Sequence, residues 1–364
     1  MSAPMSTLEV LRPVLIMAGG TGGHIFPGIA VAQELLARGI PVLWLGSAGG
    51  LETRLVPQAG LPIETLAISG VRGKGLLALI TAPLRILRAV FAAWRVLGRC
   101  KPRSALALGG FASGPGGIAA WLRGVPLTVH EQNRVPGATN RILSHFAIKL
   151  LCGFDGAFKH AEWTGNPVRR EIATLPPPRE RFAARNDAPR LLVLGGSQGA
   201  RALNARVPQA LATIAQERRP VVRHQCGAKL ADAARTAYAI AQVDASVEPF
   251  IQDMAAAYAW ADIIVCRAGA LTLAELAAAG VGAVLVPFPF AVDDHQTKNA
   301  AAMMQAGAAL LLPEGEASAE RIAAVLGDLL GNRPRLLAMA EAARSLAKPD
   351  AAARIADVCL QVAA

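Results

Sequence analysis

Two stretches of this chain follow the same order: a short apolar run, a glycine-rich loop and then a segment with helical character. The first is Val14–Met17 with the loop Gly19–His24, and the second, far downstream, is Leu191–Leu194 with the loop Gly195–Ala200. Glycine lets the backbone turn sharply and approach a ligand closely. The N–H groups of such a loop, with the helix start that follows, form a site for an anion or a sugar oxygen. The repeat predicts two similar nucleotide-binding α/β halves that face each other.

The spacing of the glycines argues against a nicotinamide dehydrogenase. Dinucleotide-binding loops read G-x-G-x-x-G, with an acidic residue about 20 positions later that holds the ribose. Neither loop has that spacing, and the strand expected at Pro41–Leu45 is followed by Gly46 and Ser47 rather than by an acid. A glycine-rich loop alone is equally well explained as a tight turn, so the rest of the sequence has to decide.

Length and composition set the broad class. The 364 residues predict two domains, and the 53% of hydrophobic residues argues against disorder. The five cysteines show no C-x-x-C spacing, which predicts a reduced protein with neither a disulfide framework nor a zinc site. We expect no signal peptide and no transmembrane helix.

Apolar runs alternate with helical patterns in both halves, which predicts parallel sheets with right-handed crossovers. We expect a first domain over 1–165, a proline-rich linker over 166–189 and a second domain over 190–364. The last helix either packs on the second domain or crosses back to the first domain. In such folds ligands bind beyond the carboxyl ends of the strands, here in the cleft between the domains. The expected strands are 14–17, 42–45, 105–108, 127–130, 191–194, 221–225, 263–266 and 283–286, and the expected helices include 28–37, 84–98, 116–122, 271–279 and 299–306.

The positive charge is concentrated in one segment. The net charge is +11, and the stretch from Thr65 to His130 contains basic residues but no Asp or Glu. At helical spacing, its arginines form a stripe beside Leu, Phe and Trp side chains. This pattern predicts contact with an anionic membrane surface; a solvated basic face and a nucleic-acid surface are the alternatives, and we expect no nucleic acid because no such motif accompanies the charge. The expected membrane residues are Arg72, Lys74, Arg85, Arg88, Phe91, Trp94 and Arg95.

Polar residues cluster after three strands of the first half. They lie in the loop Gly19–His24, in the loop Gly109–Gly117, and in the stretch from His130 to Asn133, with Asn140 a little further on. The carboxyl ends of parallel strands share one sheet edge, so these loops should meet there. Ser113 and Asn140, taken alone, are more simply explained as a cap and a turn residue.

The second half carries features of a nucleotide-diphosphate site. Ser197 lies in the second glycine loop, where a phosphate is its natural partner. The backbone N–H groups of 270–272, at a helix start, would point at a diphosphate. Glu275 could take two ribose hydroxyls, or it could simply satisfy the helix dipole. The pair Asp293 and Asp294 is a weak metal signal, and we expect neither an obligatory metal nor another cofactor.

Eight ordered motifs together resemble the MurG family of glycosyltransferases, within glycosyltransferase family 28, over nearly the whole chain. They are GGTGGHIFP at 19–27, ISGVRGKG at 68–75, GGFASGPGG at 109–117, HEQN at 130–133, GNPVR at 165–169, GGSQGA at 195–200, RAGALTLAE at 267–275 and DDHQTKNA at 293–300.

The resemblance implies a GT-B fold, with two Rossmann-like parallel-sheet domains facing a cleft. It implies inverting transfer of N-acetylglucosamine from UDP-N-acetylglucosamine to the 4-hydroxyl of the muramoyl sugar of lipid I, giving lipid II and UDP in peptidoglycan synthesis. The acceptor's lipid places such an enzyme peripherally at the cytoplasmic face of the bacterial inner membrane, near the cell-wall and division machinery. The alternatives are a same-fold enzyme with another lipid acceptor, a UDP-sugar epimerase, and a non-catalytic UDP-sugar-binding membrane protein.

The resemblance also assigns residues. His24 is the expected general base, because histidine changes charge near neutral pH, and Glu131 is the second candidate; a loop-stabilising hydrogen bond is the simpler role for His24. His295 stands where the family can have Gln, and Phe111 where it can have Tyr. The donor residues would be Thr21, Gly22, Gly23, Asn133, Arg169, Ser197, Ile251, Ala270, Leu271, Thr272, Glu275, His295 and Gln296, and the acceptor residues Gly110, Phe111, Ser113 and Asn140.

Overall fold

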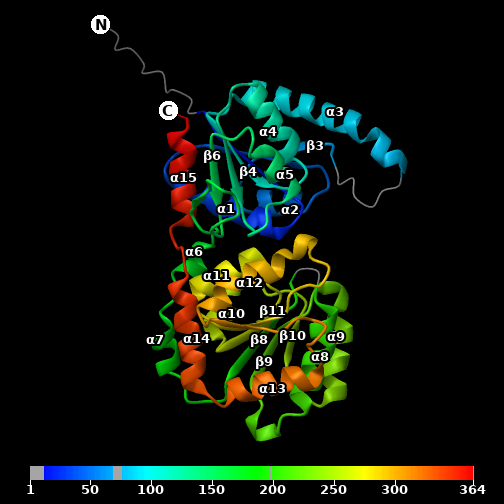
Figure 1. Ribbon diagram of the computed structural model, residues 1–364, viewed down its shortest axis with the longest axis vertical. Coiled ribbons are helices and arrows are strands. Elements are labelled where there is room, and N and C mark those ends of the chain that lie inside the picture. The colour runs from blue at the N-terminus through cyan, green and yellow to red at the C-terminus, as the bar shows by residue number, and fades with distance from the viewer. Residues whose placement is uncertain (1–11, 69–75, 197–198, 364) are drawn as a thin grey trace. The chain divides into compact units, whose positions relative to one another are not determined.

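The computed structural model describes residues 12–68, 76–196 and 199–363, and the chain divides into two compact units (Figure 1). The first unit comprises Met1–Pro167 together with Asp350–Ala364, and the second comprises Val168–Pro349. The final helix therefore belongs to the first unit. Among the described residues, no helix has the length and apolar character needed to span a bilayer.

The first unit is built on a seven-stranded parallel sheet with the order β3-β2-β1-β4-β5-β6-β7. Its central strands are almost wholly buried, which explains their unbroken apolar runs. The strands are β1 (Val14–Ala18), β2 (Val42–Ser47), β3 (Ile63–Leu66), β4 (Ser104–Gly109), β5 (Leu127–Glu131), β6 (Lys149–Cys152) and β7 (Glu162–Trp163).

Helices cover both faces of this sheet, because successive side chains of a strand point to opposite sides. Val14 and Ile16 pack with α1 (Gly22–Ala37), α2 (Glu52–Gln58) and α15 (Ala351–Gln361). Leu15 and Met17 pack on the other face with α3 (Leu76–Cys100), α4 (Ser113–Leu122) and α5 (Ala138–Leu143). Ser104 Oγ donates to the carbonyl oxygen of Cys359 at 2.7 Å, which ties α15 to this sheet.

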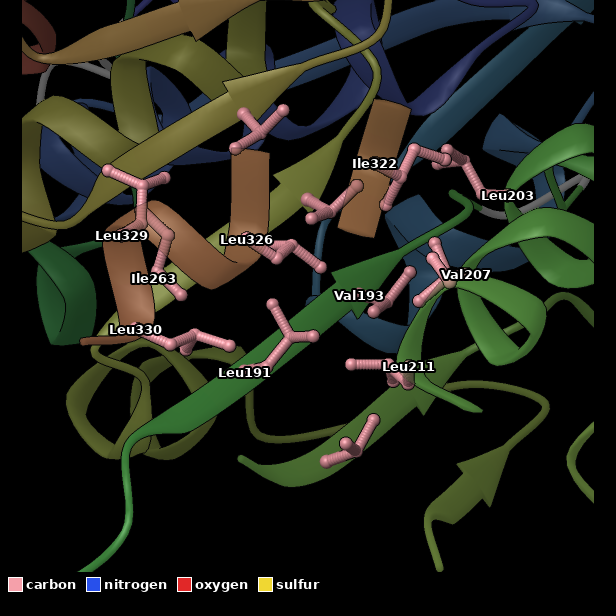
Figure 2. Packing of buried hydrophobic residues seen from close by; sticks show 14 of the residues in the cluster. Leu191, Val193, Leu203, Val207, Leu211, Ile263, Ile322, Leu326, Leu329 and Leu330 are labelled. Carbon is pink, nitrogen blue, oxygen red and sulfur yellow. The ribbon is translucent and has the colours of Figure 1, made fainter. Parts of the chain in front are cut away.

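The second unit repeats the plan with a six-stranded parallel sheet in the order β10-β9-β8-β11-β12-β13. Figure 2 shows Leu191 and Val193 of β8 packed among side chains of α8 and α13. The strands are β8 (Arg190–Leu194), β9 (Val221–Gln225), β10 (Ser246–Glu248), β11 (Ile263–Cys266), β12 (Gly282–Leu285) and β13 (Ala309–Leu311).

The helices of the second unit surround its sheet. The α-helices are α6 (Arg170–Ala173), α7 (Pro178–Ala183), α8 (Arg201–Ala212), α9 (Ala231–Ala241), α10 (Met254–Trp260), α11 (Ala270–Ala279), α12 (His295–Gln305), α13 (Ala319–Leu330) and α14 (Arg333–Ser345). Three short 3-10 turns are η1 (Gln216–Arg218), η2 (Ala228–Leu230) and η3 (Val292–Asp294).

The structure corrects two expectations. Most of the expected linker 166–189 is packed into the second unit, where buried Arg181 of α7 donates to the carbonyl oxygens of Tyr258 and Ala279. Several helices also begin earlier than expected, with α1 starting at Gly22 and running through Pro27. Pro27 in α1 and Pro83 in α3 lie beyond the first turn of their helices, so each removes one intrahelical hydrogen bond that the helix tolerates. Pro115 lies in the first turn of α4, where an N–H has no intrahelical partner to lose.

Candidate active site

His24 lies in the first turn of α1, where the loop after β1 meets the loops after β4 and β5. Its Nδ1 is 2.8 Å from Oε1 of Gln132. Gly109 lies beside the ring with φ +113°, and a Cβ there would be 3.1 Å from Cε1 of His24. The glycine at 109 thus leaves room for the imidazole, and the three loops meet at one sheet edge of the first unit as expected.

A chain of hydrogen bonds runs from His24 into the first unit. Nε2 of Gln132 is 3.1 Å from Nδ1 of His130 and donates to the His130 carbonyl oxygen at 3.0 Å. Nε2 of His130 is 2.9 Å from the carbonyl oxygen of Gly165. Burial lowers the pKa of His130 to about 4, against a smaller opposing effect of the Gly165 bond, so this histidine is neutral at working pH.

Glu131, the second candidate base, is a buried anchor for the loop that follows β5. Its Oε1 accepts from the backbone N–H of Asn133 at 2.9 Å, and its Oε2 accepts from the N–H of Gly137 at 3.1 Å and from Nδ2 of Asn140 at 2.9 Å. These three hydrogen bonds occupy both carboxylate oxygens, and through them Glu131 fixes the backbone of the loop. The geometry therefore favours His24 over Glu131 as the base.

The loop after β4 holds the expected acceptor residues in different ways. A Cβ on Gly110 would lie 2.4 Å from the carbonyl oxygen of Gly19, so glycine is needed for close approach of the two loops. Buried Ser113 places its Oγ 2.7 Å from the carbonyl oxygens of both Met17 and Gly109, so its hydroxyl is a donor that holds the loop to β1 and does not cap α4. Phe111, in contrast, is exposed and free to meet a ligand.

Glu52 is a site residue that sequence analysis missed. It is fully buried in α2, and its carboxylate accepts from the N–H of Gly20 at 3.1 Å, the N–H of Ser47 at 2.8 Å and the hydroxyl of Ser47 at 2.5 Å. Burial opposes the charge, but the hydrogen bonds outweigh it and lower the pKa of Glu52. The carboxylate thereby holds the first glycine loop, and no local sequence signal marks it.

Replacing Glu52 by glutamine should lower the free energy of unfolding of the first unit by about 2 kcal/mol at neutral pH, because an amide has one acceptor oxygen for three donors. Since folding lowers this pKa, the wild-type advantage is present above the ordinary value of 4.5 and is lost as the pH falls through the folded value. Denaturant unfolding followed by tryptophan fluorescence measures the difference. Exposed Asp155→Asn, the same carboxylate-to-amide change in the same unit, is the control, with an expected change below about 0.5 kcal/mol. A Glu52→Gln difference that grows on acidification would contradict this account.

In the second unit, Glu275 lies near the start of α11 and is almost fully buried. Its Oε1 accepts from Nη2 of Arg169 at 2.9 Å, and its Oε2 accepts from the hydroxyl of Tyr258 at 2.8 Å. Burial and the neighbouring Glu275 carboxylate raise the pKa of Tyr258 well above its usual range, so the phenol remains a donor. Arg169 and Glu275, which sequence analysis assigned to the donor, thus lie together, and Tyr258 joins them.

The second glycine loop is fixed by Gln225, another residue that sequence analysis missed. Gln225 Oε1 accepts from the N–H of Gly196 at 2.9 Å, and its Nε2 donates to the Gly196 carbonyl oxygen at 2.9 Å. Gly196 has φ +79°, in the left-handed region that favours glycine. Ser197, the expected phosphate contact, lies outside the described residues.

The other expected donor residues lie near the carboxyl edge of the same sheet. Ala270, Leu271 and Thr272 form the first turn of α11, and Ile251 is buried in the segment after β10. His295 and Gln296 begin α12, and Oε1 of Gln296 accepts from the N–H of Phe288 at 2.8 Å. Thr21, Gly22 and Gly23, in contrast, belong to the first unit, in the loop that carries His24.

Metal ligands do not gather in the part of the chain that the structure describes: no group of three or more His, Cys, Asp or Glu side chains is placed to hold an ion. Asp293 and Asp294 both have left-handed backbone, and Asp294 Oδ1 accepts from the Thr297 hydroxyl at 2.7 Å. The expectation that no metal is needed stays a prediction.

Helix α3 presents the expected membrane residues on an exposed face. Leu87 is 65% exposed and Phe91 is 59% exposed, and Phe91 stacks near Trp94. The guanidinium of Arg123 lies 3.8 Å above the Trp94 ring. Arg85, Arg88 and Arg95 are exposed on the same helix, while Arg72 and Lys74 lie outside the described residues. Further exposed apolar side chains, which the sequence pattern did not indicate, lie on α4, on α5 and just after α5, namely Trp121, Leu122, Ile142 and Ile148.

Comparison with known proteins defines the class. The model of the glycosyltransferase family 28 N-terminal domain matches residues 14–152, and that of the C-terminal domain matches residues 190–355. These ranges cover most of the chain and fall on the two parallel-sheet units. The protein is a glycosyltransferase of the GT-B class, as the sequence predicted.

Individual relatives identify the family within this class. The chain is 61% identical, over 99% of its length and 84% of the relative, to the UDP-N-acetylglucosamine–N-acetylmuramyl-(pentapeptide) pyrophosphoryl-undecaprenol N-acetylglucosamine transferase of Xanthomonas campestris pv. campestris strain 8004. It is 60% identical to the protein of the same name from Xylella fastidiosa, over 98% of both chains. The crystal structure of Acinetobacter baumannii MurG matches with a TM-score of 0.82 at 39% identity, covering 96% of this chain and 99% of that one. The chain belongs to the MurG family.

Proposed function

We propose that this chain transfers N-acetylglucosamine from UDP-N-acetylglucosamine to the 4-hydroxyl of the N-acetylmuramoyl sugar of lipid I, giving lipid II and UDP. The observation that carries the proposal is 61% identity, over nearly the whole chain, to a relative that bears this transferase name. His24 in the first unit and Glu275 in the second support it. The imidazole can take the proton of the acceptor hydroxyl, and the carboxylate can accept hydrogen bonds from the ribose of the donor.

In this reaction His24 takes the proton of the acceptor hydroxyl. The freed oxygen attacks the anomeric carbon of the donor sugar, the bond from that carbon to the diphosphate breaks, and UDP leaves with inversion. A neutral imidazole suits the step because it accepts a proton at working pH and releases it afterwards. Glu131 then serves to hold Asn133 and Asn140 in place.

The second unit supplies the donor site. The N–H groups at the start of α11, Ala270 to Thr272, carry positive potential that favours the negative charge growing on the diphosphate. The glycine loop of Gly195 and Gly196, and Ser197 beyond it, would add further donors. Glu275 would accept hydrogen bonds from the ribose hydroxyls, and Ile251 would meet the uracil through its backbone. His295 and Gln296 would contact the sugar.

The exposed face of α3 supports a peripheral position at an anionic membrane, where the lipid-anchored acceptor lies. Apolar side chains such as Leu87 and Phe91 would enter the interface, and the arginines beside them would meet lipid headgroups. Because the donor is a nucleotide sugar, the proposal assigns this surface to the cytoplasmic face of the inner membrane. Contacts with the cell-wall and division machinery belong to the same proposal.

The membrane proposal predicts a specific loss. Changing the three exposed arginines of α3 to glutamine (Arg85, Arg88 and Arg95) should weaken binding to phosphatidylglycerol vesicles by about 100-fold, because each basic side chain near the surface contributes about 1 kcal/mol. Vesicle sedimentation measures the binding. The matched control replaces three exposed arginines of the second unit, Arg218, Arg235 and Arg321. Equal losses in both triple variants would show that net charge, and not this face, drives the binding.

The transfer itself is tested with labelled UDP-N-acetylglucosamine and a lipid I analogue, in the presence of EDTA. We expect label in the lipid product, with much less transfer from UDP-N-acetylgalactosamine and none to a lipid diphosphate that lacks the muramoyl sugar. Transfer to other lipids only would contradict the proposed acceptor. Interconversion of UDP-sugars without acceptor would indicate an epimerase, and donor binding without any reaction would indicate a non-catalytic protein.

A further inference from the structure

We propose that Gln132 is a positioning residue that keeps the imidazole proton of His24 on Nδ1, so that Nε2 is free to take the proton of the acceptor. The inference rests on the proposed function, in which His24 is the base. It goes beyond that function because it assigns the tautomer of the base and names the groups that impose it. Each of these groups belongs to the first unit.

The proton positions follow from the inner end of the chain of hydrogen bonds. The Gly165 carbonyl oxygen can only accept, so Nε2 of His130, 2.9 Å away, carries a proton. His130 is fully buried and neutral, and its Nδ1 is therefore an acceptor that requires a donor. The neighbouring group is the side-chain amide of Gln132 at 3.1 Å.

Two acceptor atoms of His130 then fix the orientation of the Gln132 side-chain amide. Its nitrogen lies 3.1 Å from Nδ1 of His130 and 3.0 Å from the His130 carbonyl oxygen, and both of these atoms are acceptors. If the amide nitrogen and oxygen exchanged places, the oxygen would face two acceptors in a buried site. Both hydrogen bonds would then be lost, and each loss costs free energy. The amide oxygen must therefore point toward His24, where it lies 2.8 Å from Nδ1.

An amide oxygen can only accept, so Nδ1 of His24 is the donor and the neutral ring has its lone pair on Nε2. Without such a partner, an imidazole in water prefers its proton on Nε2, which would block that nitrogen as a base. The backbone of Gln132 is itself held, because its carbonyl oxygen accepts from Nδ2 of Asn166 at 3.0 Å. Gln132 is 1% exposed, so solvent cannot replace it as the partner of the ring.

The most direct test measures the tautomer in the wild-type chain. The protein contains six histidines, so selective labelling with ¹⁵N-histidine gives a spectrum in which comparison with a His24→Asn variant assigns the His24 signals. The ¹⁵N shifts distinguish a protonated ring nitrogen from an unprotonated one. We expect His24 to carry its proton on Nδ1 at neutral pH. A His24 ring protonated on Nε2 in the folded wild-type chain would overturn the inference, whatever the activity.

A Gln132→Met variant tests the consequence, because methionine keeps the length of the side chain and removes the amide. We expect the His24 signals to shift toward the Nε2-protonated form and kcat to fall by about 10- to 100-fold, the scale of a misplaced catalytic group. KM for UDP-N-acetylglucosamine should stay within about threefold, since most of the expected donor residues lie in the other unit. Gln58→Met, at an exposed position of the same unit, should change neither quantity.

Two further outcomes separate this inference from the proposal on which it rests. A Gln132→Met variant that loses the Nδ1 preference but keeps its kcat would overturn the positioning role and leave the transferase proposal intact. A wild-type chain that holds the proton on Nδ1 and transfers no N-acetylglucosamine would overturn the proposed function, and with it the part of Gln132 in catalysis.

Discussion

Replacing His24 by alanine is expected to lower kcat for transfer to a lipid I analogue by about 100-fold or more, the usual contribution of a general base. KM for UDP-N-acetylglucosamine should change little, because a base acts in the transition state and the donor residues lie mainly in the second unit. The ring sits beside Gly109 and is anchored at Nδ1 to Gln132 at 2.8 Å. Steady-state kinetics with both substrates varied measure the two constants.

The control for His24→Ala is His145→Ala, a histidine of the same unit outside the site. Its kcat should equal that of the wild type. Equilibrium binding of UDP to both variants checks that the donor site is intact. If His24→Ala turns over within a few-fold of the wild-type rate, the residue is only a loop-stabilising partner of Gln132, and the base has to be sought elsewhere.

Replacing Glu275 by glutamine is expected to raise KM for UDP-N-acetylglucosamine by about 10- to 100-fold, which corresponds to a hydrogen bond made by a charged group. A carboxylate has about four lone-pair positions, so the two bonds from Arg169 and Tyr258 leave two for ribose hydroxyls. The amide of glutamine has one acceptor oxygen and cannot serve all of these donors. Because the ribose is remote from the reacting carbon, kcat should fall less than KM rises.

Tyr258→Phe is the matched comparison for Glu275→Gln. It removes one donor to the carboxylate but leaves its charge and its pairing with Arg169 at 2.9 Å, so KM should change by less than about fivefold. Thermal unfolding of both variants shows whether the buried cluster has been disturbed. An unchanged KM in a folded Glu275→Gln variant would place the ribose elsewhere and assign Glu275 to a purely structural ion pair.

The sequence was sufficient for the main features of the fold because those features depend on local patterns. The buried runs at 14–17 and 191–194 became central strands, each followed by a glycine loop. Short edge strands such as β7 and β13 were not predicted, because they bury few side chains and their sequences show only a weak apolar pattern. The predicted helix starts lie too late where a proline such as Pro27 indicates a boundary, because that proline lies inside α1.

The site was only partly predictable for a different reason. His24 and Glu275 stand in motifs that can be read along the chain, but the residues that hold them come from distant positions. Gln132 is 108 residues from His24, and Glu52 reaches a glycine loop 32 residues away. Such pairings depend on strand order and on burial, which no single segment encodes. The two roles of Glu131 and Gln132 in one motif, an anchor and a proton-orienting amide, likewise emerge only from their partners.

The measurement that tests the central claim most directly is the structure of the product formed by the purified chain from UDP-N-acetylglucosamine and a lipid I analogue. Mass spectrometry and proton NMR should show one added N-acetylglucosamine, joined through a β-linkage to the 4-hydroxyl of the muramoyl sugar, with UDP as the second product. A product with the α-configuration, with the sugar on another hydroxyl, or with no sugar transferred would contradict the account.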